Sequence, residues 1–418
     1  ERREELARLE ARDTGKALRT ARVDAQVLAR YFEFYAGACD KLHGETLPFQ
    51  SGYTVLTLRE PLGVTGHIIP WNYPLQVFGR SVGASLAAGN ACVVKPAEDG
   101  SLSLLRVAEL AAQIGFPSGT INIVTGYGHE AGAALTAHAG IDHISFTGST
   151  VTGKAVAHAA AERHCPVVLE LGGKSPQILF ADADLDAALP AVVNAIAQNC
   201  GQTCSAGSRL LVERGIYERV MEKLAKRFGE LRAGPSEMDL DMGPLVNRKQ
   251  FDQVRSLLAR AEADGIVVAA RGIVATGAPA GGFYQEAVLL RDVPPDHLLA
   301  QKEIFGPVLC VVRVGSLEEA IALVNANPYA NGAAVFTRSG YAARRFQQDC
   351  EVGMAGVNVP IPVPMAFFSF GGWRNSLFGD LHVHGMDGVR FYTRTKVMTS
   401  RWPDDGSAAP GFHMPVMG

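Results

Sequence analysis

The chain has 418 residues, of which 47% are hydrophobic and 19% charged, and its formal net charge is −3. A chain of this length favours two or more domains over a single core. Its mixed charges form no basic footprint for nucleic acid, and no apolar run reaches the roughly 18 residues that span a bilayer, so neither nucleic acid nor a membrane is an expected partner.

The first half of the chain has the pattern of a parallel α/β sheet. Residues 1–10 resemble the middle of a charged amphipathic helix and include no initiator Met, so we expect an N-terminal piece to be missing. From about 62 to 173, β-rich runs alternate with alanine-rich helical stretches, which predicts a mostly parallel sheet covered on both faces. Ligands bind such sheets at the carboxyl ends of the strands. The expected strands are 64–69, 91–94, 121–124, 143–146 and 167–171.

A second α/β segment is expected from about 174 to 373, which gives two lobes that meet at a cleft. Two stretches that alternate with period 2, 53–58 and 389–397, predict exposed strands with edges open to partners. Residues 403–418 lose periodicity and predict a loosely held tail. The expected helices of the second segment are 185–199, 217–231, 248–264 and 317–325, and its expected buried strands are 308–312 and 333–336.

One cysteine lies among small and polar residues directly after a helical pattern, in Gly201-Gln202-Thr203-Cys204. An accessible thiol at such a boundary suits a nucleophile, although the pattern alone fits an inert buried cysteine as well. The seven cysteines include no C-x-x-C pair. This argues against a disulfide framework and a structural zinc site, and it favours a reducing cytoplasm.

Two further residues follow strands. Glu170 ends an apolar run, where partial desolvation would bring its pKa toward that of a general base, although a solvated strand-end Glu fits too. Asn72 lies between Pro70 and Pro74, so a rigidly held carboxamide could donate to an oxyanion. The same segment also fits an ordinary turn.

Several segments suit a nucleotide. The run from Phe146 to Thr150 joins a strand to a helix N-terminus that could hold a phosphate, or be a plain N-cap. Lys95 and Glu98 suit ribose hydroxyls, or form a surface ion pair. Glycines at 126, 128 and 132 are a weak phosphate signal. His382 and His384 lack a third ligand at motif spacing, so no metal site is predicted.

In this order along the chain, the motifs resemble the aldehyde dehydrogenase superfamily over nearly the whole sequence. The segments that carry the resemblance are 70–74, 95–98, 146–150, 170–174, 201–204, 303–307 and 370–372. The resemblance implies an α/β fold with a Rossmann-like cofactor domain, an α/β catalytic domain and a small β oligomerisation arm, in a homodimer or homotetramer. The implied boundaries are 1–43 and 62–172 for an N-terminally incomplete NAD-binding domain, 173–386 for the catalytic domain, 44–61 and 387–402 for the oligomerisation strands, and 403–418 for the tail.

The resemblance also implies roles. Cys204 is the nucleophile that attacks a small-molecule aldehyde, Asn72 and the Cys204 backbone N–H form the oxyanion hole, and Glu170 activates the water that hydrolyses the thioester. Because the Glu98 carboxylate would repel a 2′-phosphate, NAD is expected over NADP. The implied cofactor-binding residues are Ile69, Trp71, Lys95, Pro96, Glu98, Gly128, Gly132, Phe146, Gly148, Ser149, Leu171, Glu303 and Phe305.

The substrate pocket is expected to include Tyr73, Arg80 and Phe370. Arg80 stands where succinate semialdehyde dehydrogenases carry an arginine for the substrate carboxylate, but Gln198 replaces their second arginine. A carboxylate-bearing semialdehyde is therefore one hypothesis, and neutral aliphatic or aromatic aldehydes stay open.

Three alternatives remain open. Segments 358–364, 368–370, 379–381 and 391–393, with 400–402, are similar to the methylmalonate semialdehyde dehydrogenase branch, which passes its thioester to coenzyme A. That branch has Asn at the position of Glu170, so the Glu predicts water as the acceptor. The other two are a catalytically silent scaffold and a cysteine hydrolase, for which no histidine motif is present.

Overall fold

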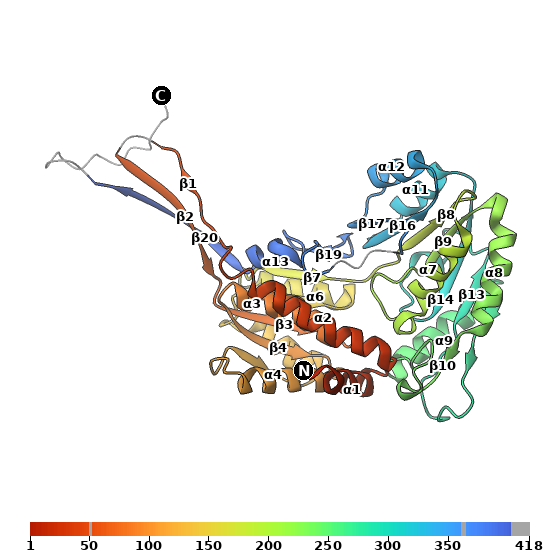
Figure 1. Cartoon of the computed structure of the whole chain (residues 1–418), viewed down its shortest axis with the longest axis horizontal. Helices are drawn as coiled ribbons and strands as arrows, with labels where there is room; N and C mark the ends of the chain where they lie inside the picture. Colours follow the sequence, from red (N-terminus) through yellow and green to blue (C-terminus); the bar gives the residue numbers. More distant parts are fainter. Residues whose placement is uncertain (50–51, 361–364, 403–418) are drawn as a thin grey trace.

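The structure is a computed structural model that describes residues 1–49, 52–360 and 365–402. Two lobes, each built on a mostly parallel sheet, lie side by side, and a narrow antiparallel arm projects from the first lobe (Figure 1). Within these residues, no helix is long and apolar enough to cross a membrane.

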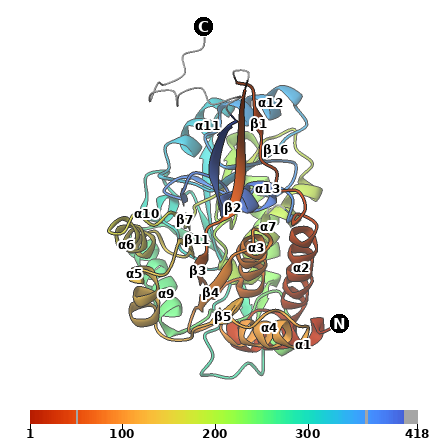
Figure 2. The ribbon, with the colours of Figure 1, turned by 90° about the vertical axis from the view of Figure 1, so that its left-hand side faces the viewer.

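The first lobe holds a six-stranded sheet in the order β19-β7-β6-β3-β4-β5, in which β19 runs antiparallel to β7. Helices α5 and α6 lie on one side of this sheet, and α2 and α3 lie on the other (Figure 2). The elements are α1 (Arg3–Thr14), α2 (Leu18–Ala36), β3 (Val64–Ile69), α3 (Pro74–Ala87), β4 (Ala91–Pro96), α4 (Leu102–Gln113), β5 (Ile121–Ile123), η1 (Gly128–Gly132), α5 (Ala133–Ala137), β6 (His143–Thr147), α6 (Thr150–Ala161), β7 (Val167–Glu170), β19 (Leu377–Phe378) and α13 (Gly385–Phe391).

The second lobe holds a seven-stranded sheet in the order β11-β13-β14-β9-β8-β16-β17, parallel except for β11. Its elements are β8 (Pro176–Leu179), α7 (Leu185–Ala197), η2 (Gln198–Gly201), β9 (Arg209–Glu213), η3 (Arg214–Ile216), α8 (Tyr217–Glu230), β10 (Arg232–Ala233), η4 (Ser236–Met238), α9 (Arg248–Ala263), β11 (Val267–Arg271), β12 (Ile273–Val274), β13 (Val288–Arg291), α10 (Leu298–Gln301), β14 (Val308–Val314), α11 (Leu317–Asn325), β15 (Tyr329–Ala330), β16 (Gly332–Phe336), α12 (Gly340–Asp349), β17 (Met354–Val357) and β18 (Trp373–Arg374).

The arm joins β1 (Thr46–Leu47), β2 (Tyr53–Pro61) and β20 (Thr393–Arg401) in an antiparallel sheet. β2 and β20 pair over their whole lengths, from Tyr53 opposite Arg401 to Pro61 opposite Thr393. Most side chains of β20 are exposed, because the arm has no helix layer over it.

The helices form where apolar residues recur at helical spacing. In α8, a buried stripe of five residues faces the hydrophobic core of the second lobe, and the polar residues between them face solvent. α3 begins with Pro74 in its first turn, where the missing N–H costs nothing. The buried stripe of α8 consists of Tyr217, Val220, Met221, Leu224 and Phe228.

The expected strands and helices are present, with two corrections of their bounds. The exposed strand expected at 389–397 begins only at Thr393, because Gly385–Phe391 forms α13. Val389 there is fully buried, and such a short apolar run does not distinguish a strand from a helix. The helix expected at 185–199 ends at Ala197, because Asn199 and Cys200 have positive φ angles of 50° and 55°.

The division into domains at residue 173 and residue 386 stays a prediction. β19 pairs with β7 of the first sheet, although it falls within the range 173–386 that we expected to form the second lobe. The tail expected at 403–418 lies outside the described residues.

Candidate active site

A cavity of about 270 Å³ lies where the two lobes face one another. It brings together five of the residues expected at the site, which come from the start of α3, from the segment after η2 and from the C-terminal part of the chain. These five are Asn72, Tyr73, Arg80, Cys204 and Phe370.

The Cys204 thiol is half-buried and follows η2, where the positive φ angles of Asn199 and Cys200 turn the chain out of the α7 direction. The pKa of Cys204 is raised to about 12, mainly by burial and also by the Glu170 charge, while Arg80 acts in the opposite direction. The resting group is therefore a neutral thiol near pH 7. To attack a carbonyl, it must lose its proton to a nearby base.

Glu170 lies at the end of β7. It is not among the residues that line the cavity, but its negative charge raises the pKa of the Cys204 thiol. Both carboxylate oxygens are buried and have no hydrogen-bond partner among the described residues. This burial raises the pKa of Glu170 to about 8, against the attraction of Arg80. The carboxyl group is thus close to the pKa that general base catalysis needs at neutral pH.

Asn72 is 8% exposed and is bonded to the second lobe. Its Nδ2 donates to the backbone oxygen of Gln202 (3.0 Å), and its own backbone oxygen accepts from Asn199 Nδ2 (3.1 Å). A carboxamide nitrogen carries two hydrogens, so one N–H remains for an oxyanion in the cavity.

Arg80 is a buried cation whose charge lowers the pKa of the buried Glu170 carboxyl. Its Nη2 donates to Thr147 Oγ1 (2.8 Å), and its guanidinium lies 5.1 Å from the centre of the Phe370 ring. Among the described residues it forms no ion pair, although it is only 7% exposed. A desolvated cation is costly unless it is paired, so Arg80 gives the cavity a preference for an anionic group.

A nucleotide would fit the adjacent edge of the first sheet. The ends of β3, β4 and β6 lie beside one another there, because β3 is paired with both neighbours. Lys95 at the end of β4 bonds the Glu98 carboxylate (3.1 Å). A separate cavity of about 200 Å³ beside them is lined by Pro96, Ala97, Glu98, Ser101, Thr125, Gly126 and Tyr127.

The start of α6 lies on the same edge, and its helix N-terminus would suit a phosphate. Ser149 is its N-cap, and its Oγ accepts from Thr152 N (3.2 Å). A side chain at Gly148 would lie 2.6 Å from the Phe146 ring, so only glycine keeps the backbone open before the helix. These residues fit a dinucleotide at a helix N-terminus. Gly128 and Gly132 lie further on, in η1, and their role stays a prediction.

Four further residues expected to bind the cofactor are Trp71, Leu171, Glu303 and Phe305. The rings of Trp71 and Phe305 are edge to face at 5.4 Å. Glu303 Oε1 accepts from Gly173 N (3.0 Å), and burial raises the pKa of Glu303 to about 7. Leu171 is buried against Gly153 of α6.

The sequence analysis missed several lining residues. Tyr31 and His384 are joined through Tyr31 Oη and His384 Nε2 (2.9 Å), and Thr203 lies beside Cys204. No sequence signal connects residues 353 positions apart, so only folding could reveal the first pair. His384 is 2% exposed, and burial holds its pKa well below the usual range. In the described part of the chain, no three His, Cys, Asp or Glu side chains are arranged to hold a metal.

Two α/β lobes with a cysteine, a carboxamide and a buried carboxyl group near their junction suit an enzyme that forms a covalent intermediate. Residues 1–398 match the aldehyde dehydrogenase family, and the chain belongs to that family. It is therefore an enzyme, and the α/β fold and the family resemblance expected from the sequence are confirmed.

Three similar proteins each align with most of this chain. Hydroxyisobutyraldehyde dehydrogenase of Mycolicibacterium austroafricanum is 41% identical over 395 residues, which are 94% of this chain and 77% of the relative. A crystal structure from Burkholderia cenocepacia, assigned to the aldehyde dehydrogenases, is 60% identical with a TM-score of 0.93. The match covers 96% of this chain and 84% of the chain in that structure. One from Sinorhizobium meliloti 1021, assigned as a methylmalonate-semialdehyde dehydrogenase and complexed with NAD, is 36% identical with a TM-score of 0.93, and covers 96% and 83%.

Proposed function

We propose that this enzyme oxidises an aldehyde to a carboxylic acid with NAD, through a thioester on Cys204 that water hydrolyses. The observation that carries the proposal is the position of Cys204 and Asn72 in one cavity, next to the buried Glu170 carboxyl with its pKa of about 8. A relative crystallised with NAD supports the choice of cofactor.

In the first half of the reaction, the Cys204 sulfur bonds to the carbonyl carbon, and the thiol proton passes to solvent. Asn72 Nδ2 and the Cys204 backbone N–H stabilise the oxyanion. NAD held by Lys95, Glu98 and Ser149 would supply the acceptor for the hydride of this carbon. The carbonyl reforms, and the acyl group remains on sulfur as a thioester.

In the second half, the Glu170 carboxylate takes a proton from water, and the hydroxide attacks the thioester carbon. The carbon–sulfur bond breaks, the acid leaves and Cys204 recovers its proton. Glu98 near the ribose site carries a carboxylate that would repel a 2′-phosphate, which supports NAD over NADP.

Turnover with a panel of aldehydes tests this proposal through NADH absorbance. We expect Cys204→Ala to reduce turnover at least about a thousandfold, because no other group would form the covalent intermediate. Cys165→Ala is the matched control, since that thiol is also half-exposed but lies outside the cavity, and its turnover should equal the parent's. Comparable activity of the Cys204 variant would refute the covalent route.

Arg80 supports a substrate with a carboxylate at the end remote from the aldehyde, as in a semialdehyde. We expect Arg80→Ala to lower kcat/KM for succinate semialdehyde about 30-fold more than for butanal, because the charged hydrogen bond exists only with the first substrate. Comparing two substrates on one variant cancels effects of Arg80 on Cys204 and Glu170. Equal losses for both substrates would end this hypothesis.

Transfer of the acyl group to coenzyme A is the second candidate, favoured by the likeness to a structure assigned as a methylmalonate-semialdehyde dehydrogenase. Turnover without coenzyme A distinguishes the two. A hydrolytic enzyme continues at an unchanged rate, whereas an acylating enzyme stops after one NADH per site.

The proposal includes an oligomeric state and a cellular location. The arm segments 44–61 and 387–402 would pair across a homodimer or homotetramer, and in the second segment the strand begins at Thr393. The seven cysteines are all free thiols, which supports a reducing cytoplasm.

A further inference from the structure

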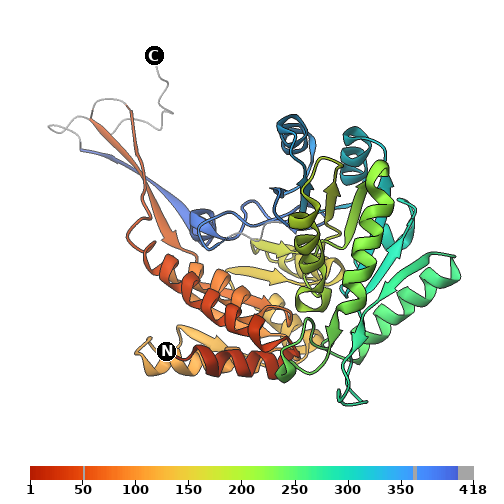
Figure 3. The same ribbon diagram turned by 45° about the vertical axis from the view of Figure 1, so that its right-hand side comes forward.

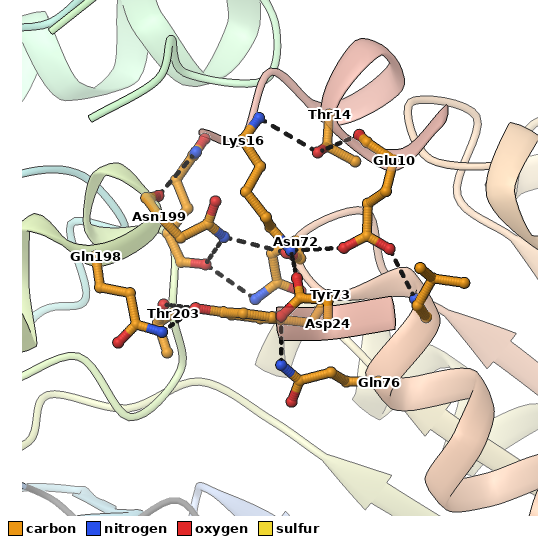
Figure 4. Close-up of polar contacts among 12 residues, drawn as sticks. Glu10, Thr14, Lys16, Asp24, Asn72, Tyr73, Gln76, Gln198, Asn199 and Thr203 are labelled. Atoms are coloured by element: carbon orange, nitrogen blue, oxygen red, sulfur yellow. Dashed lines mark hydrogen bonds and ion pairs between the residues drawn. The ribbon is translucent and has the colours of Figure 1, made fainter. Parts of the chain in front are cut away.

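A buried charge cluster lies behind the cavity, in the N-terminal helices that the sequence motifs leave out. Lys16 is almost wholly buried, and its Nζ bonds Glu10 Oε1 (2.8 Å) and Asp24 Oδ2 (Figure 4). Burial lowers the pKa of Lys16, but Asp24 and Glu10 raise it above the usual range, so the ammonium stays charged. We call these three residues the Lys16 cluster.

Each member of the Lys16 cluster contacts the segment that presents Asn72. Lys16 Nζ lies 4.1 Å from the centre of the Tyr73 ring, within the range of a cation–π interaction. Glu10 Oε2 accepts from Leu75 N (3.2 Å), and Asp24 Oδ1 accepts from Gln76 Nε2 (2.6 Å). The start of α3 is therefore contacted by all three residues of the Lys16 cluster (Figure 4).

The Tyr73 hydroxyl extends this contact to the second lobe. Tyr73 Oη is bonded to Thr203 Oγ1 (3.0 Å) and accepts from Gln198 Nε2 (3.4 Å). Thr203 directly precedes Cys204. The turn between α1 and α2 also lies beside the second lobe (Figure 3). There Arg19 N, in the first turn of α2, donates to Asp239 Oδ1 (2.7 Å).

Stability alone does not account for this cluster. Burying a cation and its carboxylates costs solvation free energy, and apolar side chains of similar volume are often as stable. A methionine at position 16 would fill the same space. It would not supply a charge over the Tyr73 ring. That charge restricts the orientation of Tyr73, which lines the cavity and bonds Thr203, the residue before Cys204.

We propose that Lys16 is a positioning residue for the reaction. Held by Glu10 and Asp24, its ammonium orients Tyr73, and the Tyr73 hydroxyl orients Thr203 and thereby the Cys204 thiol. This inference rests on the proposed role of Cys204 as the nucleophile.

The rate of Cys204 alkylation by iodoacetamide tests the proposal without substrate or cofactor. Peptide mass spectrometry separates this thiol from the other six. We expect Lys16→Met to slow alkylation about fivefold and to lower kcat by a similar factor. The neutral triple variant Lys16→Met/Glu10→Gln/Asp24→Asn should be equally slow, because it also lacks the cation but strands no buried carboxylate. Alkylation of the triple variant at the parent rate would overturn the proposal.

A double-mutant cycle with Tyr73→Phe shows whether Lys16 acts through the Tyr73 hydroxyl. Phenylalanine keeps the ring but loses the bond to Thr203, so adding Lys16→Met to it should change the alkylation rate less than twofold. A full fivefold effect in that background would overturn the proposal. Leu224→Ala, a core variant of α8, controls for stability and should alkylate at the parent rate. If the parent oxidises no aldehyde, the proposed function fails, while the alkylation cycle still tests the positioning role.

Discussion

At the scale of single residues, burial sets the chemistry of the site. Cys204 and Glu170 are both ordinary residue types whose pKa values are raised because their charged forms lose hydration. The Glu170 charge adds to the rise in the pKa of Cys204, because two like charges would then lie in one buried site. Near pH 7 the expected resting state is therefore a neutral thiol beside a mostly protonated carboxyl group.

Glu170→Gln should separate the two halves of the reaction. With glutamine, no base activates water, so we expect a burst of one NADH per site followed by turnover at least about a hundredfold slower than the parent's. In the parent, the rate of thioester hydrolysis should rise with pH through about 8, because only the carboxylate accepts a proton. Stopped-flow absorbance against pH measures both. The exposed residue Glu318 provides the control variant Glu318→Gln, which should keep the parent's profile.

The same carboxyl should make stability depend on pH. Its pKa of about 8 in the folded state exceeds the value of about 4.3 in an unfolded chain. The neutral form therefore favours folding below pH 4.3, and this contribution is lost as pH rises to 8. We expect the Tm of Glu170→Gln to exceed that of the parent by more at pH 9 than at pH 5. An equal difference at both values, by calorimetry, would contradict this.

At the scale of elements, the short η2 turn and the arm matter most. η2 ends α7 early and directs the following residues toward α3, which brings Cys204 to Asn72. In the arm, β20 lies at the edge of its sheet and exposes Val397 (62%) and Met398 (42%). An exposed strand edge with apolar side chains is suited to pairing with another chain.

Val397→Lys should weaken assembly through the arm. A lysine on that strand would place a charge in any interface that covers β20, so we expect a smaller species by light scattering at the same concentration. Ile114→Lys is the control, because Ile114 is also exposed but lies at the end of α4. An unchanged mass for Val397→Lys would show that assembly does not depend on this strand.

At the scale of the whole molecule, the site depends on the contacts that hold the two lobes against one another. The first turn of α2 contacts the second lobe through Arg19, and Asn72 contacts it through Gln202 and Asn199. A ligand that binds the folded state and not the unfolded state stabilises all of these contacts together.

NAD should therefore raise the Tm of the intact protein. At a hundredfold excess over Kd, the gain is about 2.7 kcal/mol, which corresponds to at least about 3 °C. We expect NADP to give a smaller shift, and Glu98→Gln to reduce the difference between the two cofactors by removing the repulsive charge. Equal shifts for NAD and NADP in the parent would contradict the preference.

By itself, the sequence determined the class of fold and most of its elements, because β-rich runs alternating with helical patterns have few other solutions. It also identified Cys204, Glu170 and Asn72 as candidates, since each follows a strand or a helix at a segment of recognisable pattern. Tertiary structure decided what these groups face. The orphaned oxygens of Glu170, the pairing of Tyr31 with His384 and the Lys16 cluster depend on contacts between distant segments. Burial and hydrogen-bond partners are properties of the packed chain, and they set the pKa of Glu170 and the orientation of the residues around Cys204.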